Sequence, residues 1–403
     1  MQNLMKAYLQ LDVNELPIHE PYDGYVESKS HVHATLSHPV RMAMPQVVSL
    51  LKSVTGCVYD CVSWWLERAP LLTASQLYRS VMQHPQVQIW CEKHKHLHRQ
   101  TIETFIYTLR YQVLAYPHFQ LSQPLLQSFD DLSLKGEVPV EFLGLPAPGI
   151  YLELITPQHR HASNPQIEMS GHSFVIEGVY LNEYSFQSVP LDLLSDKAIE
   201  SLSLLPSRPL RIIECCFSAS PITLKSGDPL IFDQASYFSL YIQDETELVS
   251  DIVLRHRAYF ERRDRFDEQE WEAMETHFET VLKSLLYINI KDHQRAVMND
   301  KKALSTRLSR ASSRVQKRSI SKKRDVAFDH IRVGSTQPYV SLSTLTHKIR
   351  DKTGLVPHFR RSYYAPRWTG VGRTERQIVR IKATIINASD LGEAAVAFKR
   401  YLV

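Results

Sequence analysis

The spacing of apolar residues changes along this chain, and each change limits what the segment can form. Apolar residues recur at three- and four-residue intervals within 41–137, and this period predicts helices because it places them on one face. From about 138 they occur in short runs rich in β-branched and aromatic residues, which is typical of strands. We therefore predict an α+β fold in which an N-terminal helical bundle precedes a mostly antiparallel sheet.

Individual elements follow from the same pattern. A helix is predicted at 267–289, where Asp267 and Glu270 have capping-box spacing and an apolar stripe is expected to pack on the sheet. The expected helices of the N-terminal part span about 47–65, 74–84 and 102–116. The expected strands are 150–156, 172–181, 209–217 and 235–243.

Proline content and charge divide the rest of the chain. Residues 1–40 contain several prolines and are expected to be irregular. Residues 295–326 are rich in Ser, Lys and Arg with isolated aliphatic residues, so they bury too little apolar surface to offset their chain entropy. We predict a flexible basic linker there. It would join an α+β domain at 138–294 to a basic C-terminal segment at 327–403 that contains a small β segment.

The charge of the chain is divided unevenly, although its net charge is only +4. Residues 295–382 contain 22 Lys and Arg against 5 Asp and Glu, a net charge of +17. Residues 1–294 contain 23 Lys and Arg against 36 Asp and Glu, a net charge of −13. Such a basic segment favours a polyanionic partner such as RNA, the ribosome or an acidic protein face. A solvated tail that aids solubility is the alternative.

The most distinctive part of this basic segment is the stretch PHFRRSYYAPRWTGVGRTERQIVRIKATIIN at 357–387. Arginine offers a planar fork to phosphate or carboxylate, and aromatic rings stack on nucleic-acid bases. Spaced glycines allow close approach of the backbone, and the alternation from 377 to 387 predicts a strand. The candidate residues for nucleic-acid or partner binding are His358, Arg360, Arg361, Tyr363, Tyr364, Trp368, Gly370, Gly372, Arg373, Arg376 and Arg380.

The same residues also fit a structural role. Trp368 and the tyrosines would then anchor the C-terminal loop on the body of the protein. The arginines would bond to carbonyl groups or pair with acidic groups of the N-terminal part. The two roles are compatible, because an anchored loop would hold its arginines in fixed positions.

Motifs for metal binding or catalysis are weak. Cys57, Cys61, Cys91 and His94 do not have a specific zinc spacing, and a thiol on an apolar helix face more often packs as a small hydrophobe. The sequence contains no G-x-S-x-G motif and no G-x4-G-K-[ST] motif. We therefore expect no catalytic residue, no metal, no cofactor and no small-molecule substrate.

The cysteine pattern and the hydropathy of the chain indicate the cellular compartment of the protein. The five cysteines are odd in number and two are adjacent, a pattern that does not predict a disulfide framework. The first residues lack the apolar core of a signal peptide, and no stretch approaches the roughly 18 apolar residues of a membrane span. We expect a cytoplasmic protein without membrane contact.

The C-terminal stretch also resembles a known family. The pattern P-H-x-R-R-x-x-[WY], then W-x-G-x-G, then a basic strand ending in I-N, is similar to the C-terminal signature of the type V-A anti-CRISPR inhibitor family of plasmids and phages. Weaker similarity includes FLGLPAPGIYLEL at 142–154, HSFVIEGVY at 172–180 and VLKSLLYIN at 281–289. The matching residues of the signature are Pro357, His358, Arg360, Arg361, Tyr364, Trp368, Gly370, Gly372, Arg380 and Asn387.

This resemblance implies a non-catalytic protein of a mobile element that acts in the cytoplasm of a bacterial host. The family suppresses production of the CRISPR effector nuclease by recognising its N-terminal polypeptide while it is being made, with loss of the messenger RNA. The expected partners are therefore the nascent nuclease and, from the charge of 295–382, RNA or the ribosome. Two alternatives stay open: an RNA nuclease that uses His358 with Arg360 and Arg361, and a plasmid DNA-binding protein.

Overall fold

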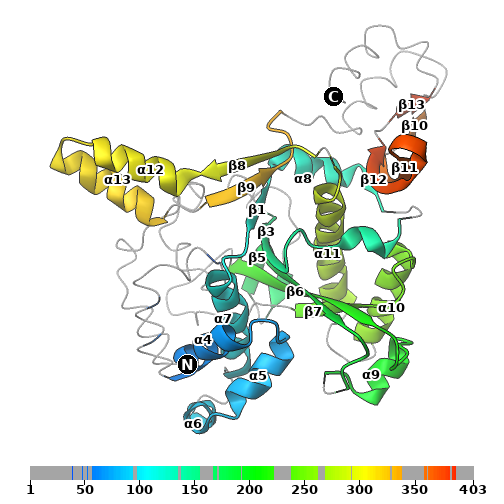
Figure 1. Ribbon diagram of the computed structural model, residues 1–403, viewed down its shortest axis with the longest axis horizontal. Coiled ribbons are helices and arrows are strands. Elements are labelled where there is room, and N and C mark those ends of the chain that lie inside the picture. Colours follow the sequence, from blue (N-terminus) through cyan, green and yellow to red (C-terminus); the bar gives the residue numbers. More distant parts are fainter. Residues whose placement is uncertain are drawn as a thin grey trace.

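The computed structural model describes residues 57–93, 98–134, 138–154, 167–169, 172–191, 193–221, 237–261, 268–291, 293–326, 329–337, 358–360, 362–381 and 384–386, together with 39, 48 and 52. A large mixed sheet forms the centre of the fold (Figure 1). The strand order is β7-β6-β5-β3-β1-β9-β8, and β4 pairs with β5. Its strands are β1 (His118–Leu121), β3 (Gly149–Glu153), β4 (Ile167–Met169), β5 (His172–Phe186), β6 (Leu210–Pro221), β7 (Tyr237–Ile242), β8 (Arg295–Asn299) and β9 (Asp329–Val333).

The sheet confirms the expected α+β class, but its strands come from a longer part of the chain than predicted. Strand β1 lies within 41–137, which we expected to be helical, and β9 lies within the segment expected to be separate, 327–403. These two strands pair in parallel with each other, and β1 also pairs in parallel with β3; the remaining pairs are antiparallel. All four residues of β1 are buried, so this strand lacks the alternation that marks a half-exposed strand.

Helices cover both faces of the sheet (Figure 1). On one face, α11 (Glu268–Ile288) buries Phe278, and the centre of its ring lies 4.5 Å from the centre of the Phe238 ring on β7. On the other face, Tyr151, Tyr180 and Cys216 of β3, β5 and β6 pack with the helices of the N-terminal part. Because successive side chains of a strand point to opposite faces, neighbouring residues of one strand contribute to two different cores.

The N-terminal part contains α4 (Cys57–Arg68), α5 (Ala74–Met82), α6 (Pro85–Lys93) and α7 (His98–Val113). These helices share one apolar core, to which α4 contributes Val58 and Val62. Thr73 begins α5 with a capping box, since its hydroxyl accepts from Gln76 N and Gln76 Oε1 accepts from Thr73 N. Helices α5 and α7 agree with the predicted ranges, whereas most of 47–56 lies outside the described residues.

Residues 295–326 do not form the predicted flexible linker. They form β8 and then two helices, α12 (Asp300–Arg310) and α13 (Arg314–Val326), which lead back into β9 (Figure 1). We call α12 and α13 together the arm, residues 300–326. Low apolar content wrongly predicted a flexible segment, because the arm does not depend on a large apolar core of its own. The paired strands β8 and β9 hold both of its ends, and its two helices pack on each other.

The C-terminal part forms a β-hairpin on the body of the protein. It consists of β11 (Ser362–Thr369) and β12 (Glu375–Ile381), and β11 also pairs with the short β2 (Leu132–Ser133). We call residues 362–381 the hairpin. The single strand expected at 377–387 is divided, because β13 (Thr384–Ile386) pairs with β10 (His358–Arg360) in a separate two-stranded sheet.

One edge of the large sheet is covered by a helix. Strand β7 is an edge strand, and α10 (Val249–Glu261) lies against it. The backbone N–H of Tyr241 donates to His256 Nε2 at 2.9 Å, and the Tyr241 carbonyl accepts from Arg255 at 3.2 Å. His256 Nδ1 donates to the Ile252 carbonyl at 2.8 Å, so the ring is neutral when both bonds are made.

This histidine predicts a loss of stability in weak acid. Burial, with a contribution from Arg255, lowers the pKa of His256 to about 3, whereas an unfolded histidine titrates near 6.5. As the pH falls, His256 therefore takes up a proton in the unfolded chain before it does so in the folded chain. This difference should lower the free energy of unfolding by about 2 kcal/mol from pH 7 to pH 5. Denaturant unfolding at several pH values measures the change. In His256→Gln, which keeps an acceptor for Tyr241, this part of the pH dependence should disappear; an unchanged slope would refute the assignment.

Within the described part of the chain, no helix combines the length and hydropathy that a membrane span requires.

Candidate nucleic-acid interface

The base of the hairpin is anchored in the main core. Tyr364 is 1% exposed, and its hydroxyl donates to the carbonyl of Lys283 on α11 at 2.9 Å. Burial raises the pKa of the Tyr364 phenol, so this group remains a donor. Ile378, two positions along the same face of the hairpin, is also buried. Tyr364 therefore has the anchoring role that the sequence left open, and its ring is not accessible for stacking.

Two of the candidate arginines face the body of the protein. Arg376 forms an ion pair with Glu141 at 2.7 Å, and its guanidinium carbon lies 5.8 Å from the centre of the Phe142 ring. Arg380 donates to the carbonyl of Ser128 on α8 (Gln123–Asp130) at 3.4 Å. Both side chains lie on the face of the hairpin that carries Tyr364. Their first role is thus to hold the hairpin in place.

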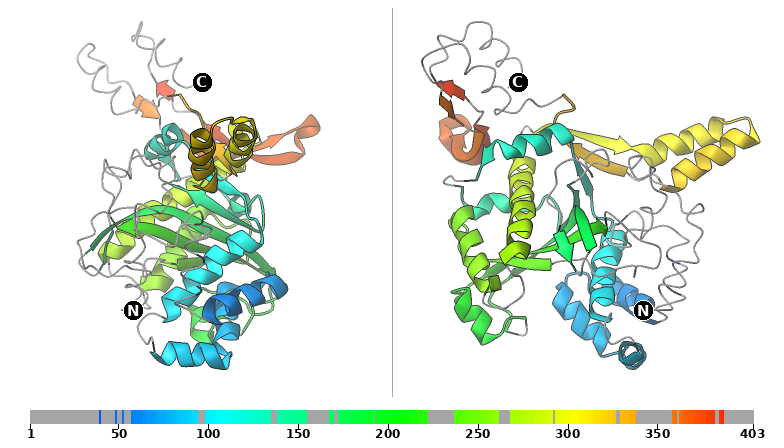
Figure 2. Two further views of the ribbon diagram at one scale, coloured as in Figure 1. Left: turned by 90° about the vertical axis from the view of Figure 1, so that its left-hand side faces the viewer. Right: turned by 180° about the vertical axis from the view of Figure 1, so that it is seen from behind.

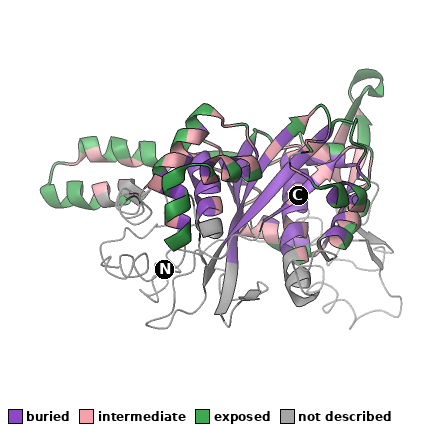
Figure 3. Cartoon of the chain, turned by 90° about the horizontal axis from the view of Figure 1, so that it is seen from below, coloured by how far each residue is buried: buried purple, intermediate pink, exposed green. Residues whose placement is uncertain are grey.

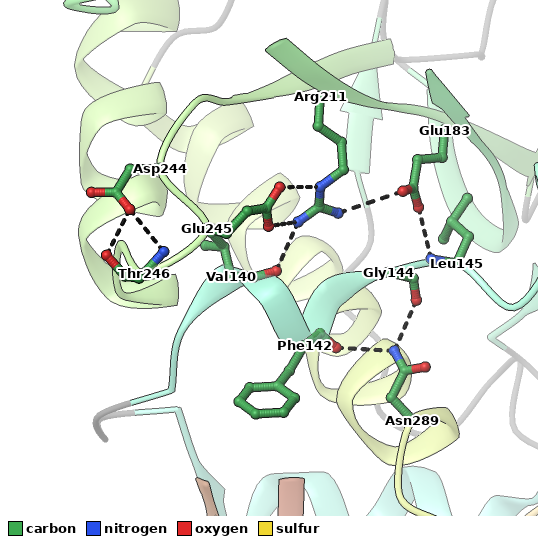
Figure 4. A network of polar contacts seen from close by, with 10 residues as sticks. All are labelled: Val140, Phe142, Gly144, Leu145, Glu183, Arg211, Asp244, Glu245, Thr246 and Asn289. Carbon is green, nitrogen blue, oxygen red and sulfur yellow. Dashed lines mark hydrogen bonds and ion pairs between the residues drawn. The ribbon is translucent and has the colours of Figure 1, made fainter. Parts of the chain in front are cut away.

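A polar network fixes the segment that receives Arg376 (Figure 4). This segment is η3 (Val140–Leu143). Arg211 donates to the Val140 carbonyl at 2.9 Å and pairs with Glu245 at 2.5 Å, while Asn289 donates to the carbonyls of Phe142 and Gly144 at 2.9 and 2.8 Å. Arg211 of β6 and Asn289, which follows α11, therefore hold the segment that carries Glu141 and Phe142 at its contact with the hairpin.

The tip of the hairpin faces solvent. Trp368 is 60% exposed and Val371 is 99% exposed. Arg367 and Arg373 are exposed as well, and neither forms an ion pair with another residue of the described chain. Gly370 and Gly372 have φ values of 81° and 72°, which are conformations that favour glycine, so these glycines shape the turn at η5 (Val371–Arg373). The tip therefore presents an aromatic ring and two cations.

The remaining candidates are placed only in part. His358 and Arg360 lie in β10, where the structure describes their backbone pairing with Ile386 and Thr384. Arg361 lies outside the described residues. Tyr363 is half-buried on the opposite face of the hairpin from Tyr364. The chain brings Tyr363, Trp368, Arg373, Arg376 and Arg380 into one hairpin, but it directs them to different sides.

The arm is a second cationic feature, and none of its residues is among the candidate binding residues chosen from the sequence. Residues 300–326 contain 10 Lys and Arg against 2 Asp, a net charge of +8. The arm extends away from the sheet and is exposed along most of both helices (Figures 2 and 3). Eight of its basic side chains are exposed, and seven of these form no ion pair within the described part of the chain. These seven are Lys301, Lys302, Arg307, Arg310, Arg314, Lys317 and Arg318.

A local signal for the arm was present in the sequence. Ser313 stands three positions before Gln316 and accepts a hydrogen bond from the Gln316 N–H at 3.1 Å, which starts α13. Leu304 and Leu308 recur at a four-residue interval, and both are half-buried, as is Ile320. Cap signals and short-range spacing thus indicate the two helices even though an extended apolar stripe is missing.

The described residues contain no group of three His, Cys, Asp or Glu side chains placed to hold an ion. Burial raises the pKa of Cys61 and Cys91, as expected of thiols that pack in an apolar environment. His94 lies outside the described residues.

The sequence model of the anti-CRISPR type V subtype A2 family, described as AcrVA2-like, matches residues 119–388. The match covers 270 of the 403 residues. This chain belongs to the AcrVA2-like family. The matched region begins within β1 and continues past β13, so it contains most of the sheet, the arm and the hairpin. Helices α4 to α7 precede it.

Two other comparisons accompany this AcrVA2-like assignment. The crystal structure of AcrVA2 aligns with 84% of this chain and 97% of that chain, at 12% sequence identity and a TM-score of 0.42. A search of curated proteins finds no match. Membership of the AcrVA2-like family confirms the resemblance carried by residues 357–387 and supports an anti-CRISPR role with a protein partner in a CRISPR system.

The anchor of the hairpin predicts a stability effect. Tyr364→Phe should lower the free energy of unfolding by about 1 to 2 kcal/mol, because it removes the hydrogen bond to the Lys283 carbonyl in a buried place. Trp368→Phe on the exposed tip is the matched control and should change it by less than about 0.5 kcal/mol. Denaturant unfolding compares the two. Equal effects would show that Tyr364 does not anchor the hairpin.

Proposed function

We propose that this AcrVA2-like protein recognises the N-terminal part of a CRISPR effector nuclease while it is being made and lowers its messenger RNA, with its basic C-terminal region in contact with RNA or the ribosome. Family membership supports the anti-CRISPR part of this proposal. The observation that carries the RNA part is the arm, with its seven exposed basic side chains that lack ion pairs within the described chain. The site of action is the cytoplasm of the bacterial host.

Phosphate contacts explain how a basic arm serves a selective inhibitor. Lys and Arg bind phosphate groups whatever the base sequence, and they release the counterions that surround the nucleic acid. The arm therefore provides affinity for any nearby RNA. Recognition of one polypeptide has to come from the folded body, whose elements are held in fixed positions. Together the two would keep the protein near translating ribosomes and restrict its action to one product.

The arm and the hairpin tip offer different chemistry to RNA. Residues 295–326 contain no Phe, Tyr or Trp, so the arm contributes charge without base stacking. The hairpin tip adds the exposed ring of Trp368 and the exposed cations Arg367 and Arg373. Stacking on a base requires an unpaired nucleotide, whereas phosphate contacts do not. The arm is thus suited to structured RNA and the tip to a single-stranded loop.

Cell-free translation tests this function directly. The messenger RNA of a type V-A effector nuclease and that of an unrelated protein are translated together with the purified chain, and both messages are measured over time. We expect selective loss of the nuclease message. The loss should stop when the first codons are altered to encode a different peptide. Equal decay of both messages, or no decay, would refute the proposal.

The nuclease alternative has its own test. Incubation of the pure protein with RNA, without ribosomes, should leave the RNA intact if the protein is a binding protein. Cleavage that is lost in His358→Ala would instead support the RNA nuclease. Competition between RNA and duplex DNA for the protein separates RNA binding from the plasmid DNA-binding alternative.

A further inference from the structure

The second edge of the large sheet is open within the part of the chain that the structure describes. There, strand β8 lies at the end of the strand order and pairs with β9 alone. Four of its five residues are exposed, and Val297 is 65% exposed despite its apolar side chain. The opposite edge strand, β7, is covered by α10 through Arg255 and His256. Natural proteins usually protect edge strands, so the difference between the two edges calls for a function.

The register identifies which backbone groups of β8 point outward. The N–H of Gly334 donates to the carbonyl of Gln294 at 2.8 Å, so this opposed pair is a hydrogen-bonded one. Hydrogen-bonded and non-hydrogen-bonded pairs alternate along an antiparallel ladder. Arg295 and Val297, opposite Val333 and Ile331, therefore turn their N–H and C=O groups away from β9. No hydrogen bond to these outward groups occurs within the described part of the chain.

From this geometry we infer that β8 is the docking edge for an extended segment of the nascent nuclease, which pairs with it as an added strand. The inference deepens the proposed function and rests on it. A chain that has just left the ribosome is unfolded, so its backbone groups are free to pair with an edge. A folded partner has already satisfied those groups within its own structure.

Side-chain chemistry narrows the segment that would fit. Arg295 and Val297 are two positions apart and share one face of the strand. Cross-strand neighbours favour opposite charge and apolar contact. The added strand would therefore place an acidic residue beside Arg295 and an apolar residue beside Val297, two positions apart in its own sequence. Lys301 and Lys302, which follow β8 after Asp300, extend the preference for acidic peptide.

The probes for this inference are synthetic peptides of about 12 residues that tile the N-terminal part of a type V-A effector nuclease. Binding to the full-length protein is measured by fluorescence anisotropy. Val297→Pro removes one outward N–H and leaves the ladder to β9 intact, since proline is accepted on the open side of an edge strand. We expect it to weaken binding of the best peptide at least about tenfold. Val297→Thr keeps the N–H and the β-branched shape, and it should weaken binding less than about threefold.

A second experiment does not depend on folding of a variant. The best peptide is synthesised with single backbone N-methyl groups at successive positions and bound to the unaltered protein. Because alternate residues of an added strand donate to β8, methylation should weaken binding at every second position only. Arg295→Glu should weaken the acidic peptide at least about tenfold.

The outcomes separate the two proposals. If a peptide binds tightly and neither Val297→Pro nor the position of the N-methyl group changes its affinity, the edge-strand inference is wrong. Recognition of the nuclease would still hold. If no peptide in the series binds, both the inference and recognition of the nascent nuclease fail. Weakening by Val297→Pro together with a two-residue methylation period would establish the edge as the site.

Discussion

Glutamine at the seven exposed basic positions of the arm that lack ion pairs is expected to remove most of the salt-sensitive RNA affinity of the protein. Seven phosphate contacts give a dependence steep enough that the unaltered chain should lose about 1000-fold in affinity between 50 and 200 mM salt. The variant should bind RNA weakly at 50 mM salt, and its affinity should change little when salt is added. Glutamine favours helix formation, so the arm itself is expected to remain folded. Titration of a labelled RNA at several salt concentrations measures both quantities.

The control keeps the charge of the arm and alters its neutral surface. Glutamine at Ser305, Ser309 and Ser319, all exposed, should leave affinity and salt dependence close to those of the unaltered chain. Circular dichroism of both variants confirms that α12 and α13 are retained. If the seven-residue variant and the unaltered chain show the same steep salt dependence, the arm is not the RNA interface, and Arg367 and Arg373 of the hairpin tip become the residues to test.

Removal of Arg110 is expected to destabilise the fold by about 3 to 5 kcal/mol. Its side chain on α7 is 1% exposed, donates to the Tyr184 hydroxyl and lies 4.0 Å from Glu214 on β6. Glu214 also accepts from the Ala74 N–H at the start of α5 at 3.3 Å. The group thus joins the N-terminal helices to the sheet. Without Arg110, burial leaves an uncompensated carboxylate between them.

A double variant and a pH series test the cause of this effect. Arg110→Met with Glu214→Gln should recover most of the lost stability, because neither buried charge remains. Burial already raises the pKa of Glu214, and the positive charge of Arg110 opposes that rise. In Arg110→Met the carboxyl should therefore take up a proton on folding, and the loss of stability should be smaller at pH 5 than at pH 8. A loss of the same size at both pH values would indicate lost packing alone.

The elements that could be predicted are the long ones with a consistent period. Strands β5 and β6 and helix α11 have many apolar residues on defined faces, and each was located from sequence within a few residues. Strand β1 has four residues, all buried, and β9 has only two apolar residues, Ile331 and Val333, so neither shows the run of apolar residues that predicts β3. The helices of the arm were missed because they lack an extended apolar stripe; their caps and four-residue spacing are local signals, and their stability also depends on the strands that hold their ends.

The candidate site was predictable in composition but not in orientation. The charge of 295–382 follows from the sequence alone, whereas Gly370 and Gly372 were expected only to allow close approach of the backbone, and their turn is seen in the structure. The partner of Arg376 does not follow from the sequence, because Glu141 lies 235 positions away and is placed by contacts of η3 with Arg211 of β6 and with Asn289, which follows α11. Sequence identifies which residues carry charge, whereas the fold decides which of them remain available to a ligand.

The position of β9 has a consequence for how the protein itself is made. This strand sits between β1 and β8, so it is the piece that closes the sheet, yet it is synthesised after nearly everything that it joins. Until Val333 leaves the ribosome, β1 has an unfilled side and β8 has no partner within the sheet. A messenger RNA truncated before codon 329 would therefore yield a product in which β1 has an unpaired edge and the C-terminal end of the arm is not held by a strand. Such a product would be prone to aggregation and proteolysis. The large sheet would therefore close only after β9 has been synthesised, well after β1 and β3.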